Sequence, residues 1–435
     1  MSDAEELWRL GAADAARRIA AGELSSAALV AACLERISER EEAVRAWVHL
    51  DAAHALAQAH ERDAAPAPLG PLHGVPVGVK DIVDTADFPT ECGTPIHSGR
   101  RPRADADCVA RLRAAGAVVL GKTVTTELAY FKPGKTRNPA ALDRTPGGSS
   151  SGSAAAVADG HVPVAIGSQT AGSVIRPAAF CGVLGLKPTR GLVGLEGVKA
   201  LSGELDTLGW FAREPEDLEV LGVVLDDTWP EGPSLREAAA HPEPPRIAFA
   251  RTPWWDQADD EGRRAVEDAA QRLRDGGAQV RELELPERFA GLVEAQQDVM
   301  AFDMARSLEW EHDHHGDELS DVLRELLERG RAIDRATAER AVALGDECRE
   351  VLGAELAPDE ALLVPAVVGE PPPLDGGTTG DPLFCRPWTL LGVPALAVPA
   401  RTGSGGAPIG VQLVARTGGD AELLVAGAWA SRHLR

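Results

Sequence analysis

The sequence of 435 residues lacks the marks of a secreted disulfide scaffold, a zinc ribbon or a membrane protein. Its six cysteines form no C-x-x-C pair and are widely spaced, at positions 33, 92, 108, 181, 348 and 385. Such spacing predicts reduced, buried thiols. No run of 18 residues stays apolar, and the first residues show no basic segment followed by an apolar one. We therefore expect a cytoplasmic protein without a membrane span or a secretory signal.

Positively charged residues are also few, and lysine is much rarer than arginine. Lys and Arg number 44 against 67 Asp and Glu, which leaves a net charge of −23. A surface this acidic repels phosphate backbones and anionic lipids, so we expect neither direct nucleic-acid binding nor membrane binding. Hydrophobic residues make up 44% of the chain, which is enough for a large core. The expected partner is a small molecule, and homo-oligomerisation stays open.

The order of predicted elements indicates an α/β protein. Residues 1–64 are rich in alanine and have helical periodicity. Apolar residues alternate from 75 to 79, which predicts a strand that ends at Lys80. A helix over 105–115, capped by Asp105, and a short strand over 117–120 follow. Strand, helix and strand at this spacing are typical of α/β layers.

Two bends rich in glycine and serine stand out. Residues 147–153 read GGSSSGS and residues 167–173 read GSQTAGS. Between them lie an alanine-rich helix, 153–158, and an apolar run, 162–166. Runs of Gly and Ser are often flexible linkers. The adjoining helix and strand favour rigid bends instead, in which glycine allows backbone N–H groups and a serine to point at one place.

A second interpretation of the first bend is a nucleophile elbow. Residues 148–152 fit the pattern G-x-S-x-G, with Ser150 as the nucleophile. That motif requires a preceding strand and a downstream acid and histidine. Residues 143–146, DRTP, make a poor strand, and no downstream histidine lies in an obvious loop at a strand end. The elbow is therefore the weaker interpretation.

Residues 147–189 resemble the signature of the amidase signature family of serine hydrolases. The similar motifs occur in the family's order: the two bends, then RPAAFCG at 176–182 and GLKPT at 185–189. The dense similarity covers about residues 71–191, and a thinner one covers about 383–430. The resemblance implies an α/β fold in which a large mixed β-sheet is sandwiched between helical layers.

The resemblance also implies a division of the chain. An N-terminal helical segment, residues 1–64, would pack on an amidase signature domain formed by residues 65–435. The catalytic core would span about residues 71–191. Helices within about residues 286–380, the region least similar to the family, would shape a variable substrate pocket.

By resemblance, the catalytic residues form a Ser–Ser–Lys triad. Ser173 corresponds to the nucleophile, Ser149 to the bridging serine and Lys80 to the base, and a cis peptide bond would join Gly148 to Ser149. A serine attacking an amide must lose its proton, and the leaving nitrogen must gain one. A lysine can accept the proton only when burial lowers its pKa from about 10.4.

The resemblance extends to the remainder of the site. Backbone N–H groups would stabilise the oxyanion, and two residues would line the acyl pocket. The oxyanion donors would be the N–H groups of Thr170, Ala171, Gly172 and Ser173, and the pocket residues Ala129 and Tyr130. The family's chemistry requires no metal and no cofactor, so we expect neither.

Other interpretations of these residues remain open. Lys80 could form a structural ion pair with Asp81 or Asp84 instead of serving as a base. The run EHDHH at 311–315 could suggest a metal site, although a solvated helix end is the simpler interpretation because its histidines lack a clean i, i+4 pair with a distant third ligand.

Some residues depart from the common family pattern. Gln169 stands where many members have Asp, Ala171 and Ser151 replace glycines, and Arg176 follows the predicted nucleophile by three positions instead of two. None of these changes touches the triad, but they leave the geometry of the pocket open.

The expected function is hydrolysis of a carboxamide to a carboxylate and ammonia or an amine through an acyl-serine. Two alternatives remain. The chain could be the glutamine-hydrolysing subunit of a tRNA-dependent amidotransferase complex, or a catalytically silent binding protein on the same scaffold.

Overall fold

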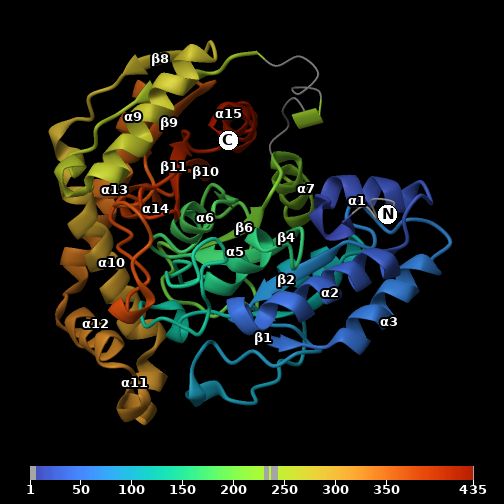
Figure 1. Cartoon of the computed structure of the whole chain (residues 1–435). Coiled ribbons are helices and arrows are strands. Elements are labelled where there is room, and N and C mark those ends of the chain that lie inside the picture. The colour runs from blue at the N-terminus through green and yellow to red at the C-terminus, as the bar shows by residue number, and fades with distance from the viewer. Residues whose placement is uncertain (1–5, 230–234, 237–242, 435) are drawn as a thin grey trace.

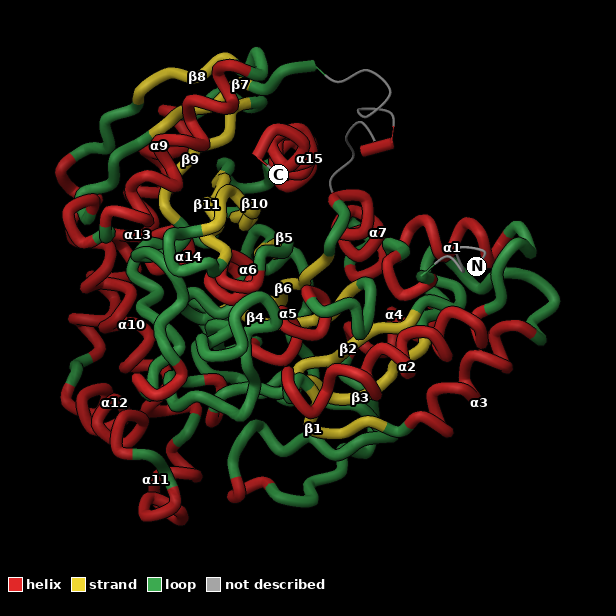
Figure 2. The backbone as a smooth tube through the Cα atoms, viewed as in Figure 1, coloured by secondary structure: helices red, strands yellow, loops and turns green. Residues whose placement is uncertain are grey.

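The computed structural model describes residues 6–229, 235–236 and 243–434. The prediction that no secretory signal is present rests partly on the first five residues. These lie outside the described residues. The described chain forms one mixed β-sheet of eleven strands with α-helices on both of its faces (Figures 1 and 2). The predicted α/β sandwich is confirmed.

The sheet order is β1-β3-β2-β4-β6-β5-β10-β11-β9-β7-β8. Parallel pairs join β2 to β3 and β4, and join β7 to β8 and β9, whereas the remaining neighbours are antiparallel. The strands are β1 (Trp47–Leu50), β2 (Pro76–Lys80), β3 (Val118–Thr123), β4 (Val164–Gln169), β5 (Leu184–Lys187), β6 (Thr207–Ala212), β7 (Arg246–Phe249), β8 (Gln279–Glu282), β9 (Glu360–Pro365), β10 (Ala395–Thr402) and β11 (Pro408–Val414).

Helices precede, cover and flank this sheet. The α-helices are α1 (Ala12–Ala20), α2 (Ser26–Val44), α3 (Ala52–Asp63), α4 (Asp107–Ala114), α5 (Ser151–Ala158), α6 (Ile175–Cys181), α7 (Pro215–Leu225), α9 (Asp260–Asp275), α10 (Leu292–Ser307), α11 (Glu309–His315), α12 (Asp321–Ala332), α13 (Arg335–Glu355), α14 (Arg386–Leu390) and α15 (Asp420–Leu434). The short 3-10 helices are η1 (Leu7–Arg9), η2 (Pro95–His97), η3 (Glu127–Ala129), η4 (Trp255–Gln257), η5 (Glu287–Gly291), η6 (Gly316–Glu318) and η7 (Leu374–Gly376).

Helices α6 and α15 cover opposite faces of the sheet near β10. Gly427 of α15 lies against the side chain of Leu396, while Ala178 of α6 lies against Gly185, the register partner of Ala397. Successive residues of a strand point to opposite faces of the sheet. Leu396 therefore points toward α15, whereas Ala397 and its partner Gly185 point toward α6 on the other face. Among the described helices, none has the length and apolar character needed to span a bilayer.

The N-terminal segment is helical, as predicted, and also contributes a strand. Helix α2 begins after Ser25, whose hydroxyl accepts a hydrogen bond from the N–H of Ala28 at 3.1 Å. Strand β1 was not predicted, because four residues between two helices show too little alternation. It pairs antiparallel with β3 at one edge of the sheet. The division of the chain at residue 64 remains a prediction.

Most predicted elements near the two bends are present with shifted ends. Strand β2 ends at Lys80, as expected, and α5 begins at Ser151, two residues before the predicted start. The predicted cap of α4 is wrong. Asp105 does not cap this helix, because its carboxylate accepts from the N–H of Ala86 at 2.8 Å and pairs with Arg113 at 3.0 Å.

The helices of the region 286–380 form a separate group beside the sheet (orange in Figure 1). Helix α10 packs against α12, α13 and α14. Because α10 also reaches the loops that follow β3 and β4, this group closes one side of the candidate site.

Candidate active site

The ends of two strands and the start of one helix meet at the predicted site. Parallel pairing sets Val79 of β2 opposite Ile166 of β4, so Lys80 emerges beside the last residues of β4. Helix α5 packs against both strands and places Ser149, just before its first turn, in the same region. Ser149 and Ser173 line one cavity.

The side chain of Lys80 is fully buried and points at hydroxyl groups. Its Nζ donates to Oγ of Ser149 at 2.6 Å and to Oγ of Ser168 at 2.9 Å. Ser168 was missed in the sequence analysis, although it lies within the second bend motif. Within the described residues, no hydrogen bond joins Ser173 to Ser149. The two serines instead line the same cavity.

The predicted alternative of an ion pair at Lys80 is wrong. Asp81 instead lies 3.5 Å from Nζ of Lys122, and both side chains are buried. Asp84 pairs with Arg100 at 2.6 Å. Both carboxylates thus pair with other basic side chains, whereas Lys80 donates to the hydroxyls of Ser149 and Ser168.

Burial lowers the pKa of Lys80 to about 7. The carboxyl group of Asp206 opposes this shift from a distance. Asp206 is itself fixed, because it accepts from Oγ1 of Thr170 at 2.5 Å and from the N–H groups of Leu201 and Ser202. No motif in the sequence indicates Asp206. It lies near the site because β6, which begins at the next residue, pairs with β4. Near neutral pH an appreciable fraction of Lys80 is uncharged.

The first bend has the backbone that the resemblance implies. The peptide bond between Gly148 and Ser149 is cis. Gly147 has a φ of 83°, and a Cβ at this position would lie 2.8 Å from Cα of Pro177. Only glycine combines this backbone angle with so close an approach.

Ser150 does not lie where a nucleophile elbow would place it. It is fully buried, and its hydroxyl donates to the carbonyl of Ser168 at 3.2 Å. No strand precedes it, because residues 145–150 form an irregular loop. The elbow interpretation is therefore wrong.

The second bend presents free backbone donors. In the described part of the chain, no acceptor takes a hydrogen bond from the N–H groups of residues 170–173. Ala171 does not adopt a positive φ, so replacing glycine there costs the bend no backbone strain. Its carbonyl accepts from Oγ1 of Thr389 at 2.7 Å. The bend can therefore offer its N–H groups to a ligand.

Gln169, the residue that replaces the common Asp, holds this bend in place. Its Oε1 accepts from the N–H groups of Val174 and Ile175 at 2.9 and 3.1 Å. Its Nε2 donates to Oγ1 of Thr389 at 2.9 Å. One neutral amide thus fixes both sides of the turn that contains Ser173.

Replacing Gln169 by methionine is expected to destabilise the fold and to slow turnover. Two buried N–H groups would lose their acceptor, at a cost of about 1–3 kcal/mol each. Urea unfolding would measure the stability, and kcat/KM the activity. Gln58→Met is the matched control, because Gln58 is also buried and uses both ends of its amide, between Val119 and Arg113. Similar activity of both variants would show that Gln169 does not position the bend.

The cavity beside the two serines is small, about 20 Å³, and mostly apolar. Ala129 and Tyr130, the predicted pocket residues, form part of its wall. Thr170 and Ala171, which were predicted as oxyanion donors, also line it. The sequence analysis did not assign the remaining lining residues to the pocket: Phe131, Leu201, Met300, Met304 and Arg176. Met300 and Met304 come from α10, within the predicted variable region.

The acidic and histidine-rich run at 311–315 is engaged in contacts of its own. Glu311 is buried and accepts from Lys199 at 2.5 Å and from His97 at 3.0 Å. His315 pairs with Glu318 at 2.8 Å. Within the described residues, no group of three or more His, Cys, Asp or Glu side chains is arranged to hold a metal ion.

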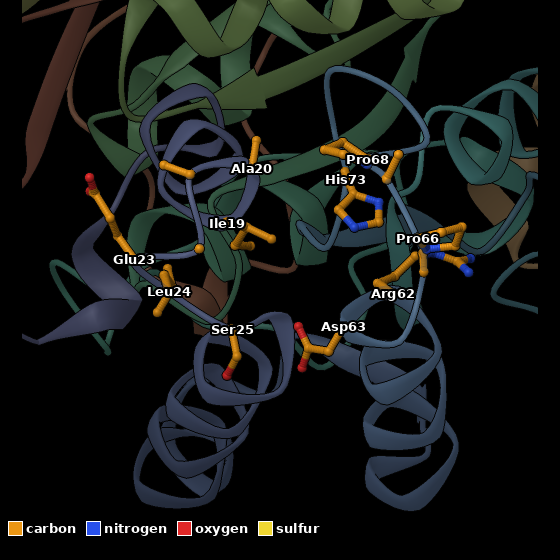
Figure 3. Close-up of a pocket in the computed structure, with 14 residues that line it drawn as sticks. Ile19, Ala20, Glu23, Leu24, Ser25, Arg62, Asp63, Pro66, Pro68 and His73 are labelled. Atoms are coloured by element: carbon orange, nitrogen blue, oxygen red, sulfur yellow. The ribbon is translucent and has the colours of Figure 1, made fainter.

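A larger hollow of about 580 Å³ lies between the N-terminal helices and the loop before β2 (Figure 3). Asp63 projects into the space between two helix ends, and its carboxylate accepts from the N–H groups of Ser26 and Ala27. Nδ1 of His73 accepts from the N–H of Leu69. None of the predicted site residues lines this hollow.

A sequence profile of the family Amidase matches residues 28–424. The chain belongs to the amidase family. One relative of this amidase-family chain is a subunit of the glutamyl-tRNA(Gln) amidotransferase of Roseiflexus castenholzii. The two are 34% identical, over 97% of the chain and 95% of the relative.

Solved structures of amide hydrolases share the whole fold. The native peptide amidase of Stenotrophomonas maltophilia superposes with a TM-score of 0.83 at 31% identity, covering 98% of this chain and 97% of that one. The 6-aminohexanoate cyclic dimer hydrolase gives 0.85 at 27% identity, with the same coverage. The chain is thus a member of an enzyme family that acts on C–N amide bonds.

Proposed function

We propose that this chain hydrolyses a small carboxamide through an acyl-serine, with Ser173 as nucleophile, Ser149 as bridging acid and base, and Lys80 as base. The observation that supports this most strongly is the buried amine of Lys80, 2.6 Å from the hydroxyl of Ser149, beside a cavity that Ser149 shares with Ser173. The pKa of that amine, about 7, suits proton transfer near neutral pH.

Protons would pass from Ser173 through Ser149 to Lys80 during attack, and in the opposite direction when the C–N bond breaks. As Oγ of Ser173 attacks the carbonyl carbon, its proton passes to Ser149, and Ser149 gives its own proton to the uncharged Lys80. The route then reverses, so that Ser149 protonates the nitrogen as the C–N bond breaks and ammonia or an amine leaves. Water attacks the acyl-serine by the same route, and the carboxylate departs.

The oxyanion of each tetrahedral intermediate would bind to the second bend. The free N–H groups of residues 170–173 supply donors that need no rearrangement when the charge develops. Loss of one such donor typically slows turnover by about 10²- to 10³-fold. The hydrogen bonds of Gln169 and Thr389 hold these donors in position.

A carboxamide panel tests the proposal. The purified chain would be incubated with short aliphatic amides, amides of dicarboxylic acids, aryl amides and glutamine, with ammonia release as the readout. Turnover of at least one simple amide, together with labelling of Ser173 by a serine-directed phosphonate, is the expected result. Absence of both would favour the catalytically silent scaffold instead.

Activity toward neutral amides is expected to rise with pH through about 7 and to level off above it. Only the uncharged amine of Lys80 accepts a proton, and this form prevails above its pKa of about 7. The profile of kcat/KM against pH reports ionisation of the free enzyme. A profile that falls as the pH rises through 7 would contradict the assignment of Lys80 as base.

A second candidate function is hydrolysis of glutamine within an amidotransferase complex. The relative that supports it, from Roseiflexus castenholzii, is named as one subunit of such an assembly and matches 97% of this chain. In this case the isolated chain would hydrolyse glutamine poorly, and partner subunits would raise the rate. Efficient turnover of simple amides by the isolated chain would decide against it.

A further inference from the structure

Asp206 is a partly buried carboxylate in the loop just before β6. The next residue, Thr207, pairs with Gln169 at the end of β4. This pairing brings Asp206 next to the second bend, where Oγ1 of Thr170 donates to its Oδ1 at 2.5 Å. Asp206 belongs neither to the predicted triad nor to the residues that line the candidate catalytic cavity.

The carboxylate of Asp206 connects two parts of the cavity wall. Its Oδ2 accepts from the N–H groups of Leu201 and Ser202 at 2.8 and 2.9 Å. Leu201 and Thr170 both line the cavity. These hydrogen bonds fix the carboxylate relative to the bend that contains the candidate oxyanion donors.

Lys80 has no ion pair of its own among the described residues. Its Nζ donates to the hydroxyls of Ser149 and Ser168 and, at 3.5 Å, to the carbonyl of Ser168. Two titratable groups act on it from farther away, the carboxylate of Asp206 and the thiol of Cys92. Burial raises the pKa of Cys92 to about 12, so this thiol is uncharged at neutral pH. Asp206 therefore supplies the negative charge that acts on the amine.

The other carboxylates of this region are held by other partners. Asp81, next to Lys80 in the chain, lies 3.5 Å from Nζ of Lys122. Asp303 of α10 accepts from Oγ of Ser202 at 2.5 Å. Asp206 has backbone and hydroxyl donors but no ion pair within the described chain, and the cation that acts on it is Lys80. The two groups thus act on each other across the end of β4.

We infer that Asp206 is a positioning residue, whose fixed negative charge stabilises the ammonium that forms when Lys80 takes the proton of Ser149. This inference rests on the proposed hydrolase function of the cavity. A charge that develops in a buried site is stabilised best by groups that are already oriented toward it. The same carboxylate keeps the amine a useful base, because burial alone would lower its pKa further.

The hydrogen bonds of Asp206 provide a competing explanation. Asp206 could act only by holding Thr170 and the loop that contains Leu201. A purely structural role lowers activity without changing the pH at which Lys80 ionises, whereas a role through charge moves that pH. Asp206→Asn separates the two explanations, because the amide has the same shape and keeps an oxygen for the backbone N–H groups.

Asp206→Asn is expected to change the pH profile of kcat/KM for a neutral amide in two ways. The plateau above pH 8 should fall by about 10-fold, because the ammonium of Lys80 loses its counter-charge. The midpoint should move below that of the wild type, because removing a negative charge favours the uncharged amine. The ratio of activity at pH 6 to that at pH 8 should then rise roughly twofold or more. A lower plateau with an unmoved midpoint would reject the inference.

Nuclear magnetic resonance of the lysine side chains measures the same ionisation without turnover. The chain would be labelled with ¹³Cε-lysine, and Lys80→Met would assign the signal of Lys80. The signal should titrate near pH 7 in the wild type and at a lower pH in Asp206→Asn. The spectrum is simple because the chain has only six lysines, at positions 80, 122, 132, 135, 187 and 199.

Asp420→Asn is the matched control. Asp420 is a buried carboxylate that accepts from the N–H and Oγ1 of Thr189, and it acts on Lys187, whose pKa burial also lowers to about 7. This variant should move the signal of Lys187 to lower pH and leave both the signal of Lys80 and amide hydrolysis unchanged. If Asp206→Asn shifts both lysine signals alike, the effect is a general change of the fold and the inference is wrong.

The two measurements keep this inference apart from the proposed function. If the chain hydrolyses no amide, the proposed function fails, whereas a shifted Lys80 signal in Asp206→Asn still supports stabilisation of the ammonium by Asp206. If the chain hydrolyses amides but Asp206→Asn leaves the Lys80 signal in place, the hydrolase stands and the role of Asp206 is rejected.

Discussion

Replacing Ser173 by alanine is expected to abolish amide hydrolysis and covalent labelling by a serine-directed phosphonate. Without Oγ of Ser173 no acyl-serine can form, although the free N–H groups of the second bend and the cavity remain. Loss of a serine nucleophile that acts with a base typically lowers kcat by about 10⁶-fold. Mass spectrometry of the labelled chain and ammonia release measure the two effects.

Ser150→Ala is the control for this experiment. Ser150 belongs to the same Gly/Ser motif, but its hydroxyl is bonded to the carbonyl of Ser168 and does not line the cavity. The Ser150 variant should keep its label. Normal labelling of Ser173→Ala would move the nucleophile elsewhere, and loss of labelling in Ser150→Ala alone would restore the elbow interpretation.

Replacing Lys80 by methionine is expected to slow amide hydrolysis by about 10²- to 10⁴-fold, the usual contribution of a positioned base. The change removes the amine that bonds Ser149 at 2.6 Å but keeps the length and apolar character of the side chain. Amides should lose more activity than esters, because a leaving nitrogen must be protonated and an alkoxide leaves more readily. Steady-state kinetics on a matched amide and ester pair measure the difference.

Lys187→Met offers an unusually close control. Lys187 is also fully buried in the sheet, its pKa is also lowered to about 7 by burial, and its Nζ donates to the carbonyl of Pro188. It does not line the cavity, so its replacement should leave hydrolysis intact. Equal losses for amides and esters in Lys80→Met would remove Lys80 from the leaving-group step, and equal losses in both lysine variants would make its role structural.

Local sequence patterns predicted the parts of the site that lie close together in the chain. Alternating valines placed Lys80 at the end of a strand, and the order of two Gly/Ser bends placed Ser149 and the 170–173 turn at the ends of α5 and β4. These features depend on φ/ψ preferences and on hydrophobic periodicity, which neighbouring residues determine. The family resemblance then related the bends to one another.

Local sequence patterns did not predict the contacts between segments that are distant in the chain. Ser168 meets Lys80 only because β4 pairs with β2, and Asp206 influences the pKa of Lys80 from a loop before β6. The rejected ion pair with Asp81 shows the same limit, since Lys122 from β3 takes that carboxylate. Sequence neighbours of a buried lysine are poor guides to its partners when strand order is unknown.

The α/β class, the rigid glycine bends and the residue types that amide chemistry requires can be read from the chain without coordinates, because they depend on local backbone preferences and side-chain chemistry. The lowered pKa of Lys80 and the meeting of Ser149 and Ser173 at one cavity cannot. Burial is a sum over many distant residues, and it exists only once strands, bends and the α10 group have closed around the same small space.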